Sequence, residues 1–216
     1  MDPMTSEEKG RFCAALAFLF SRPDESLGEF MQPVAPADEE ADVALAETNG
    51  PVSDLFSGID SDGLLGDLRR EYDRLFGDLR GERISLVEST YKAWTRDETC
   101  TLSIAGEKGL LMGDSALHLL EICRTLDLEV PEEFCGTPDH LVLELELLSW
   151  LYRTGTESQV RKFVADHLDW IPDLKRKLED AGAHSFYRGA LEKLTLFLKE
   201  EKERWKERND GPQSVH

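Results

Sequence analysis

Apolar residues recur at helical spacing along most of this chain, and this periodicity constrains its fold more than any other feature. Between residues 64 and 76, for example, they fall three or four positions apart, which places them on one face of a helix. The alternation of a half-buried strand and the Asn-Gly signal of a tight hairpin are both missing. The sequence therefore predicts an all-α protein, a single-domain bundle of roughly ten helices over residues 1–216.

Prolines, glycines and capping residues divide the pattern into segments, and Thr5 or Ser6 is expected to cap the first. The predicted helices cover residues 5–20, 24–31, 37–47, 61–76, 109–126, 138–154, 157–167, 170–180 and 184–205. We expect Thr137 to cap the helix that Pro138 begins. The tail from about residue 207 to 216 is expected to fray.

The charge of the chain excludes some partners. It carries 44 acidic and 25 basic residues, a formal net charge of −19, and twelve of the acids lie between Pro23 and Leu68, where there is no Lys or Arg. Nucleic-acid affinity depends on cations that replace counterions, so no nucleic-acid partner is expected. The acidic stretch is either a solvated face or an acidic surface that attracts a basic partner.

The only apolar run near the N-terminus, residues 12–20, follows an acidic lead and does not resemble a secretory signal. No stretch approaches the roughly 20 apolar residues that a membrane span needs, so stable membrane insertion is not expected. The four cysteines form no CxxC pair and are predicted to be reduced thiols. The sequence predicts a cytoplasmic protein.

The common catalytic motifs GxxxxGK[ST], GxGxxG, GxSxG and HExxH do not occur. None of the five histidines belongs to a strong metal-ligand pattern, and His118, among leucines, is expected to be a satisfied interior residue. The prediction is therefore a protein without enzymatic activity, cofactor or metal.

The sequence T-P-D-H-L at residues 137–141, followed by Glu144, is the most informative local cluster. A helix start explains its first three residues, but it does not explain His140 and Glu144, which are one helical turn apart. Carboxylates beside a histidine could transfer protons, or could bind an arginine by charge-assisted hydrogen bonds. Because no nucleophile or metal motif accompanies Asp139, His140 and Glu144, we favour arginine binding.

Two further clusters carry aromatic residues. The first, on the helix predicted at 61–76, consists of Tyr72, Leu75 and Phe76, residue types that are more often core than binding site. Residues 77–106 keep no helical period and are predicted to form a long loop, which carries Glu88, Tyr91 and Trp94. Aromatic side chains in such a loop could line a groove for an apolar peptide, whose basic end nearby carboxylates would hold.

Together these motifs resemble the TorD/DmsD family of redox-enzyme maturation chaperones, which is related to NarJ. The residues that carry the resemblance are Y-x-x-L-F-G at 72–77, E-S-x-Y at 88–91 and P-D-H-L-x-x-E-L at 138–145. The sequence H-L-D-W at 167–170 and the long last helix are also similar. The resemblance extends from about residue 10 to 200, most of the chain.

The resemblance implies a TorD-like helical chaperone that binds the twin-arginine signal peptide, and in some cases the body, of a molybdopterin oxidoreductase. Such a chaperone holds the precursor until its cofactor is inserted and so prevents premature Tat export. The signal-peptide contacts that the resemblance implies are Tyr72, Leu75, Phe76, Tyr91, Asp139 and His140. Charge and apolar character add Glu88, Trp94 and Glu144, and His140 is expected to titrate near physiological pH.

Two alternatives belong to other classes of function. His140, Asp139 and Glu144, joined in space by His184 or His167, could form a helical metal-dependent hydrolase. The chain could instead be an assembly adaptor for a redox-enzyme subunit that has no signal peptide. Both a monomer and a helix-swapped dimer are compatible with the sequence.

Overall fold

The computed structural model describes residues 4–27, 52, 55, 61–77 and 83–210 of the chain. Its α-helices are α1 (Ser6–Phe20), α4 (Ser61–Leu75), α5 (Asp114–Thr125), α6 (Leu141–Thr154), α7 (Glu157–His167), α8 (Ile171–Asp180) and α9 (Ser185–Asp210). Two single-turn 3-10 helices, η2 (Glu88–Thr90) and η3 (Glu132–Phe134), lie in the connections. The all-α prediction is confirmed, with slightly fewer helices in these described ranges than the ten predicted.

Local hydrogen bonds explain where two of the helices begin. The Thr5 side chain accepts from the backbone N–H of Glu8, and the Glu8 carboxylate accepts from the N–H of Thr5, which is a capping box at the start of α1. Thr156 and Gln159 form the same arrangement at the start of α7. The starts that the sequence predicted for these two helices are confirmed.

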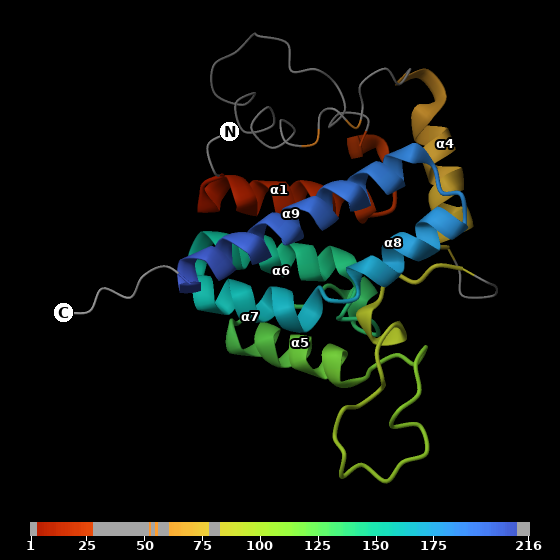
Figure 1. The fold of residues 1–216 in the computed structure, drawn as a ribbon. Helices are drawn as coiled ribbons and strands as arrows, with labels where there is room; N and C mark the ends of the chain where they lie inside the picture. The colour runs from red at the N-terminus through yellow and green to blue at the C-terminus, as the bar shows by residue number, and fades with distance from the viewer. Residues whose placement is uncertain (1–3, 28–51, 53–54, 56–60, 78–82, 211–216) are drawn as a thin grey trace.

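Helix α6 lies at the centre of the bundle (Figure 1). It packs against α1 and α7, while α9 crosses α1 and α7 and places Phe197 against Tyr152 of α6, with ring centroids 5.8 Å apart. The buried residues of α6 lie on almost all of its sides: Leu141, Val142, Leu143, Glu144, Leu145, Leu147, Leu148, Ser149, Leu151 and Tyr152. Since two of these are polar, each needs a specific hydrogen-bond partner inside the protein or on a ligand.

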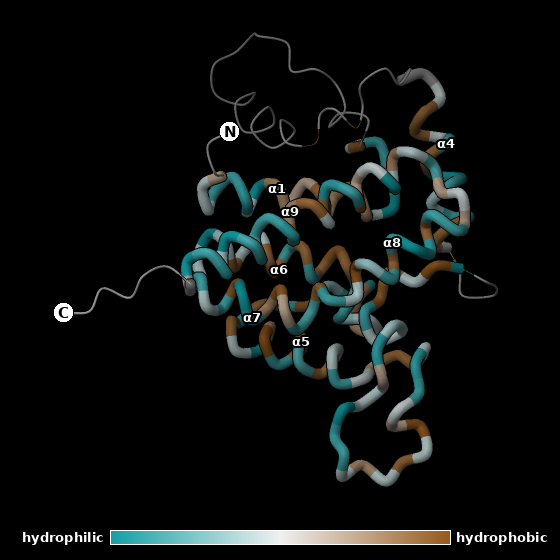
Figure 2. Tube along the Cα trace, viewed as in Figure 1, coloured by the Kyte–Doolittle hydropathy of each residue, from teal (hydrophilic) through white to brown (hydrophobic). Residues whose placement is uncertain are grey.

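Along the surface helices hydrophobic and hydrophilic residues alternate at short intervals, as the sequence predicted (Figure 2). In α8, for example, Ile171, Leu174 and Leu178 are buried while the lysines and acids between them face outward. Full burial of one such aliphatic side chain contributes roughly 2 kcal/mol, so three on one face are enough to hold a short helix on α9.

Helix α5 begins later than the sequence predicted, at Asp114 instead of residue 109. Gly109 and Met112 have φ values of 86° and 57°, in the left-handed region that a helix cannot include. Gly113 then packs so closely on Trp94 that a Cβ atom would lie 2.5 Å from the Trp94 carbonyl oxygen. The chain therefore stays irregular up to Gly113, and the loop predicted at 77–106 is longer than expected.

Helix α9 extends to Asp210, so the prediction that the chain frays from residue 207 is wrong for residues 207–210. An ion pair between Arg208 and Glu157 of α7 holds this last turn against the bundle. Of the helix predicted at 24–31, Asp24 is not helical and residues 25–27 are. Residues 28–31 lie outside the described residues, as do the helix predicted at 37–47 and the tail from 211. No helix among the described residues has the length and apolar character needed to cross a membrane.

Candidate functional site

The E-S-x-Y and P-D-H-L motifs, about 50 residues apart in the sequence, pair directly through their backbones. Val87 and His140 form an antiparallel β-bridge, and the N–H of Glu88 donates to the carbonyl oxygen of Asp139 at 2.9 Å. The Asp139 carboxylate also accepts from the N–H of Ser89 at 2.7 Å. The two motifs therefore form one structural unit, in which η2 is attached to the start of α6.

Helix α6 begins at Leu141, so the predicted start at Pro138 with Thr137 as cap is wrong. His140 is the N-cap, and its Nδ1 accepts from the N–H of Val142 at 3.2 Å. Burial lowers the pKa of His140 to about 4, and a protonated ring would lose the capping acceptor. His140 is therefore neutral at physiological pH, which contradicts the predicted titration in that range.

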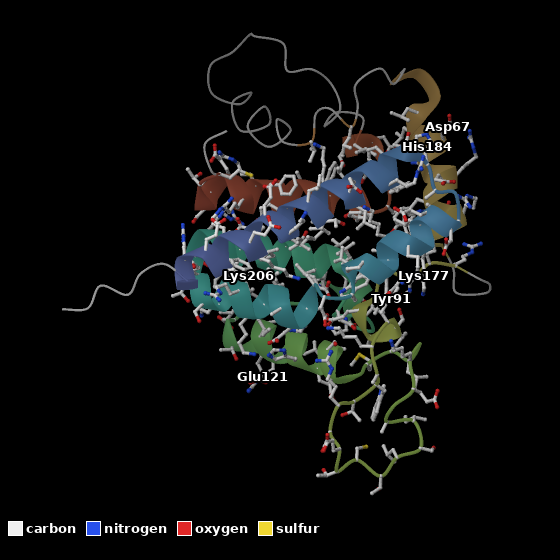
Figure 3. The ribbon with its side chains drawn as sticks, in the orientation of Figure 1. Asp67, Tyr91, Glu121, Lys177, His184 and Lys206 are labelled. Atoms are coloured by element: carbon white, nitrogen blue, oxygen red, sulfur yellow. The ribbon has the colours of Figure 1, made fainter. Side chains whose placement is uncertain are left out.

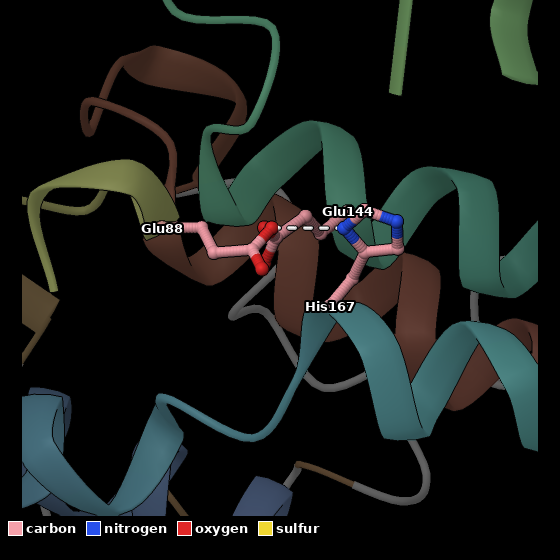
Figure 4. A group of neighbouring side chains, drawn as sticks. All are labelled: Glu88, Glu144 and His167. Atoms are coloured by element: carbon pink, nitrogen blue, oxygen red, sulfur yellow. Dashed lines mark hydrogen bonds and ion pairs between the residues drawn. The ribbon is translucent and has the colours of Figure 1, made fainter. Parts of the chain in front are cut away.

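Glu88 is the centre of a buried cluster that also contains Glu144 and His167 (Figure 4). One carboxylate oxygen of Glu88 forms an ion pair with Lys92, and the other lies 2.9 Å from Nδ1 of His167. The Nε2 atom of His167 lies 2.8 Å from Nδ1 of His118. Because Glu88 accepts, His167 donates to it from Nδ1. His118 is exposed, contrary to the prediction, although it is hydrogen-bonded.

Glu144 carries a proton in this cluster. Its side chain has no exposed surface, and both burial and the adjacent charge of Glu88 raise its pKa well above the ordinary value. Burial alone would raise the pKa of Glu88 too, but the hydrogen bond and charge of His167, with Glu144 and Lys92, outweigh it and lower that pKa. The protonated form of Glu144 can donate to Glu88, and Oε2 of Glu144 accepts from Nε1 of Trp170 at 3.2 Å.

The cluster contains ligand types that a divalent cation accepts, since the nearest ligand atoms of Glu88, Glu144 and His167 lie within 4.8 Å of one another. Lys92 already supplies the positive charge that these carboxylates need, and it also donates to the carbonyl oxygen of Asp166 at 2.7 Å. The hydrolase alternative required His140, Asp139 and Glu144, joined by His184 or His167. In the structure His140 caps α6, and of the two joining histidines His167 lies beside Glu144.

Tyr91 is buried and tightly held. Its hydroxyl donates to the carbonyl oxygen of Ser85 at 2.7 Å, and its ring lies 4.8 Å from that of Trp170 between centroids. The ammonium of Lys177 lies 4.2 Å from the centre of the Tyr91 ring (Figure 3). Tyr91 thus connects η2 to α8.

The other predicted aromatic residues lie elsewhere. Leu75 is buried, whereas Tyr72 and Phe76 are half-buried and pack edge to face at 5.1 Å. Phe76 also contacts Tyr187 of α9 at 5.4 Å. Trp94 is half-buried in the irregular segment before α5. The structure therefore brings Glu88, Tyr91, Asp139, His140 and Glu144 together, and places Tyr72, Leu75 and Phe76 in a second group on α4.

Sequence reasoning named neither Lys92 nor Trp170 as a functional residue, although both complete the cluster. A signal was present for Trp170, because H-L-D-W at 167–170 was one of the segments that carried the resemblance. Lys92 lies one helical turn from Glu88 in the sequence, but the predicted loop gave no reason to pair them.

The architecture is that of a redox enzyme maturation protein. A crystal structure from Archaeoglobus fulgidus, described as that of such a protein, matches this fold with a TM-score of 0.54 at 20% sequence identity. The match covers 91% of this chain and 96% of the other. At this identity the likeness shows the fold, and it confirms the predicted TorD-like bundle.

The sequence comparisons define the family. The family model described as "Nitrate reductase delta subunit" matches residues 38–184, and this chain belongs to that family. The selenate reductase assembly chaperone protein of Thauera selenatis is 33% identical over 103 residues, which cover 41% of this chain and 51% of that protein. The chain thus spans about half the length of this curated relative. The predicted resemblance to the NarJ-related chaperones is confirmed.

Proposed function

We propose that this protein is a cytoplasmic assembly chaperone that binds the twin-arginine signal peptide of a molybdopterin oxidoreductase. The match of residues 38–184 to the nitrate reductase delta subunit family carries the proposal. The relative named as an assembly chaperone supports the same role. Such a protein catalyses no reaction; it holds the precursor until its cofactor is inserted and thereby delays export.

The charge of the protein suits this client. A twin-arginine signal peptide has two adjacent guanidinium groups followed by an apolar run. A chain with a net charge of −19 attracts these cations over a long range, which raises the association rate and disfavours anionic competitors. Part of the binding energy is then screened Coulomb attraction, so affinity should fall as salt rises.

The predicted contact residues divide by accessibility. Tyr72, Phe76, Trp94 and His140 are half-buried, and a peptide could reach them without any rearrangement. Glu88, Asp139 and Glu144 have no exposed surface, so in this proposal they hold the backbone of η2 and α6 in place. Leu75 of α4 and Tyr91 are buried as well.

Calorimetric titration with synthetic signal peptides tests the proposal. One peptide carries Arg-Arg before the apolar run, and its matched control carries Lys-Lys. We expect micromolar or tighter binding of the first and at least about tenfold weaker binding of the second, because lysine cannot make the bidentate contact that arginine makes with a carboxylate. If neither peptide binds, signal-peptide recognition is excluded, and copurification with a mature subunit without a signal peptide would then favour the adaptor role.

A further inference from the structure

Two arginines need carboxylates that are both accessible and free of other cations. The three carboxylates of the P-D-H-L and E-S-x-Y motifs do not meet this requirement. Glu88, Asp139 and Glu144 are completely buried, and Glu88 already holds Lys92. A guanidinium could reach them only by separating η2 from α6.

A groove of about 390 Å³ lies along another face of α6. Most of its apolar lining comes from α6 and from the segment that precedes η3, with single residues from α1 and α5. The lining includes Leu128, Val130, Leu143, Leu147 and Trp150. Glu129, Glu146 and Arg153 are also part of its wall. We call this feature the outer α6 groove.

Helical geometry explains why the groove and the buried cluster share one helix. Leu143, Glu146, Trp150 and Arg153 are three or four positions apart, so they form one stripe along α6. Glu144 is about 200° away from Glu146 around the helix axis and therefore points toward the cluster. From Glu146 to Arg153 the stripe runs about 10 Å, long enough for three extended peptide residues.

The acidic end of the groove has carboxylates without cations. Within the described ranges, no lysine or arginine forms an ion pair with Glu129, Glu133 or Glu146. Burial and the nearby charge of Glu133 together raise the pKa of Glu146, which shows that these like charges lie close to one another. A bound guanidinium would relieve this repulsion.

A second observation points to a ligand. Ser149 lines the groove and is only 2% exposed, yet its hydroxyl has no hydrogen-bond partner among the residues that the structure describes. A buried hydroxyl without a partner is unfavourable unless a ligand supplies one, and a peptide backbone carries both donors and acceptors.

The groove also continues into the motif that the sequence singled out. Phe134 of η3 follows Glu133 directly, and its ring packs on that of His140 at 5.0 Å between centroids. The acidic end of the groove therefore adjoins the P-D-H-L segment on its accessible side.

We propose that the outer α6 groove binds the twin-arginine end of the client's signal peptide. The arginines contact Glu146, Glu133 and Glu129, and the apolar run that follows lies on Leu147 and Trp150. Arg153 at the opposite end repels a second basic group and so sets the direction of the peptide. This inference rests on the proposed function, since it names the surface that performs it.

A pair of double variants with equal net charge tests the inference. Glu133→Gln/Glu146→Gln removes one carboxylate of the groove wall and the neighbouring carboxylate of Glu133, whereas Glu200→Gln/Glu207→Gln removes two exposed carboxylates from α9. The probe is a synthetic peptide with Arg-Arg before an apolar run of about 12 residues, titrated calorimetrically. We expect about tenfold weaker binding for the groove variant and less than about twofold for the α9 variant, because both lose the same long-range attraction but only one loses direct contacts.

The possible outcomes separate the two proposals. If the unmodified protein binds the peptide and both double variants weaken it equally, the groove is not the site, and the proposed function stands. If the unmodified protein does not bind the peptide, both the function and the groove assignment are wrong. The circular dichroism and melting temperature of both variants should match those of the unmodified protein, because the substituted side chains are exposed.

Discussion

Glu144 and Glu146 are two residues apart on α6, yet their environments are opposite. Glu144 has no exposed surface, carries a proton and lies between Glu88 and Trp170. Glu146 is exposed and has no cationic partner in the described part of the protein. A glutamate on one face of α6 thus stabilises the fold, whereas a glutamate on the opposite face remains available for a ligand.

The difference shows how to separate structural from functional acids in this protein. The inner cluster joins η2, α6 and α7, and its hydrogen bonds continue to α5 through His118. Its members depend on one another, so the loss of one leaves a buried charge or a buried polar atom without its partner. The outer carboxylates depend on no protein partner, so their loss should change binding and leave the fold intact.

The largest effect is expected for Glu88→Ala. This change leaves the ammonium of Lys92, only 9% exposed, without its buried carboxylate partner, and it removes the acceptor for His167. We expect the free energy of unfolding to fall by about 3 kcal/mol, measured by urea denaturation. Glu146→Ala is the matched control and should change it by no more than about 0.5 kcal/mol. Equal losses in the two variants would show that the faces do not differ as described.

A smaller effect, confined to acid pH, is expected for His140→Asn. The pKa of His140 is about 4 in the folded protein and 6.5 in the unfolded chain, so the stability that the neutral ring contributes is complete above pH 6.5 and is lost as pH falls toward 4. Asparagine is an equally good cap but does not titrate. Between pH 7 and pH 4 the unmodified protein should lose up to about 3 kcal/mol more than the variant. Parallel pH profiles of the two proteins would contradict the buried, neutral cap.

An effect of the opposite sign is expected for Glu144→Gln. The folded protein keeps a proton on Glu144 that the unfolded chain releases above its ordinary pKa of 4.5, so this group destabilises the fold as pH rises. Glutamine can donate to Glu88 and accept from Trp170 without titrating. The variant should gain about 1.4 kcal/mol over the unmodified protein per pH unit until the folded pKa is reached. Urea denaturation at pH 5 to 9 measures this gain, and a constant difference would rule out the shared proton.

Much of the architecture could be predicted from the sequence because helix formation depends on local periodicity and capping. The starts of α1 and α7 are determined by Thr5 and Thr156, whose partners are three residues away. The start of α6 could not be predicted in this way. Asp139 bonds to Ser89, 50 residues earlier in the chain, and this distant contact moves the cap from Thr137 to His140.

The candidate site, too, could be predicted from the sequence only in part. The motifs that identified the family also contain Glu88, Asp139, Glu144, His167 and Trp170, so the sequence located the cluster without showing what it does. Read as isolated side chains, these residues suggested a surface that binds arginine. The structure shows them paired with one another, and it places accessible carboxylates on the outer face of α6.

The sequence by itself determined the helical class, the family and the excess of negative charge, since each depends on residue types and on their spacing along a helix. Only the tertiary structure decided which carboxylates are ionised, which are accessible and which hold the bundle together. The physical reason is that a carboxyl group's protonation and availability depend on burial and on neighbours that are distant in the chain, 79 residues apart for Glu88 and His167. Those neighbours meet only when the chain is folded.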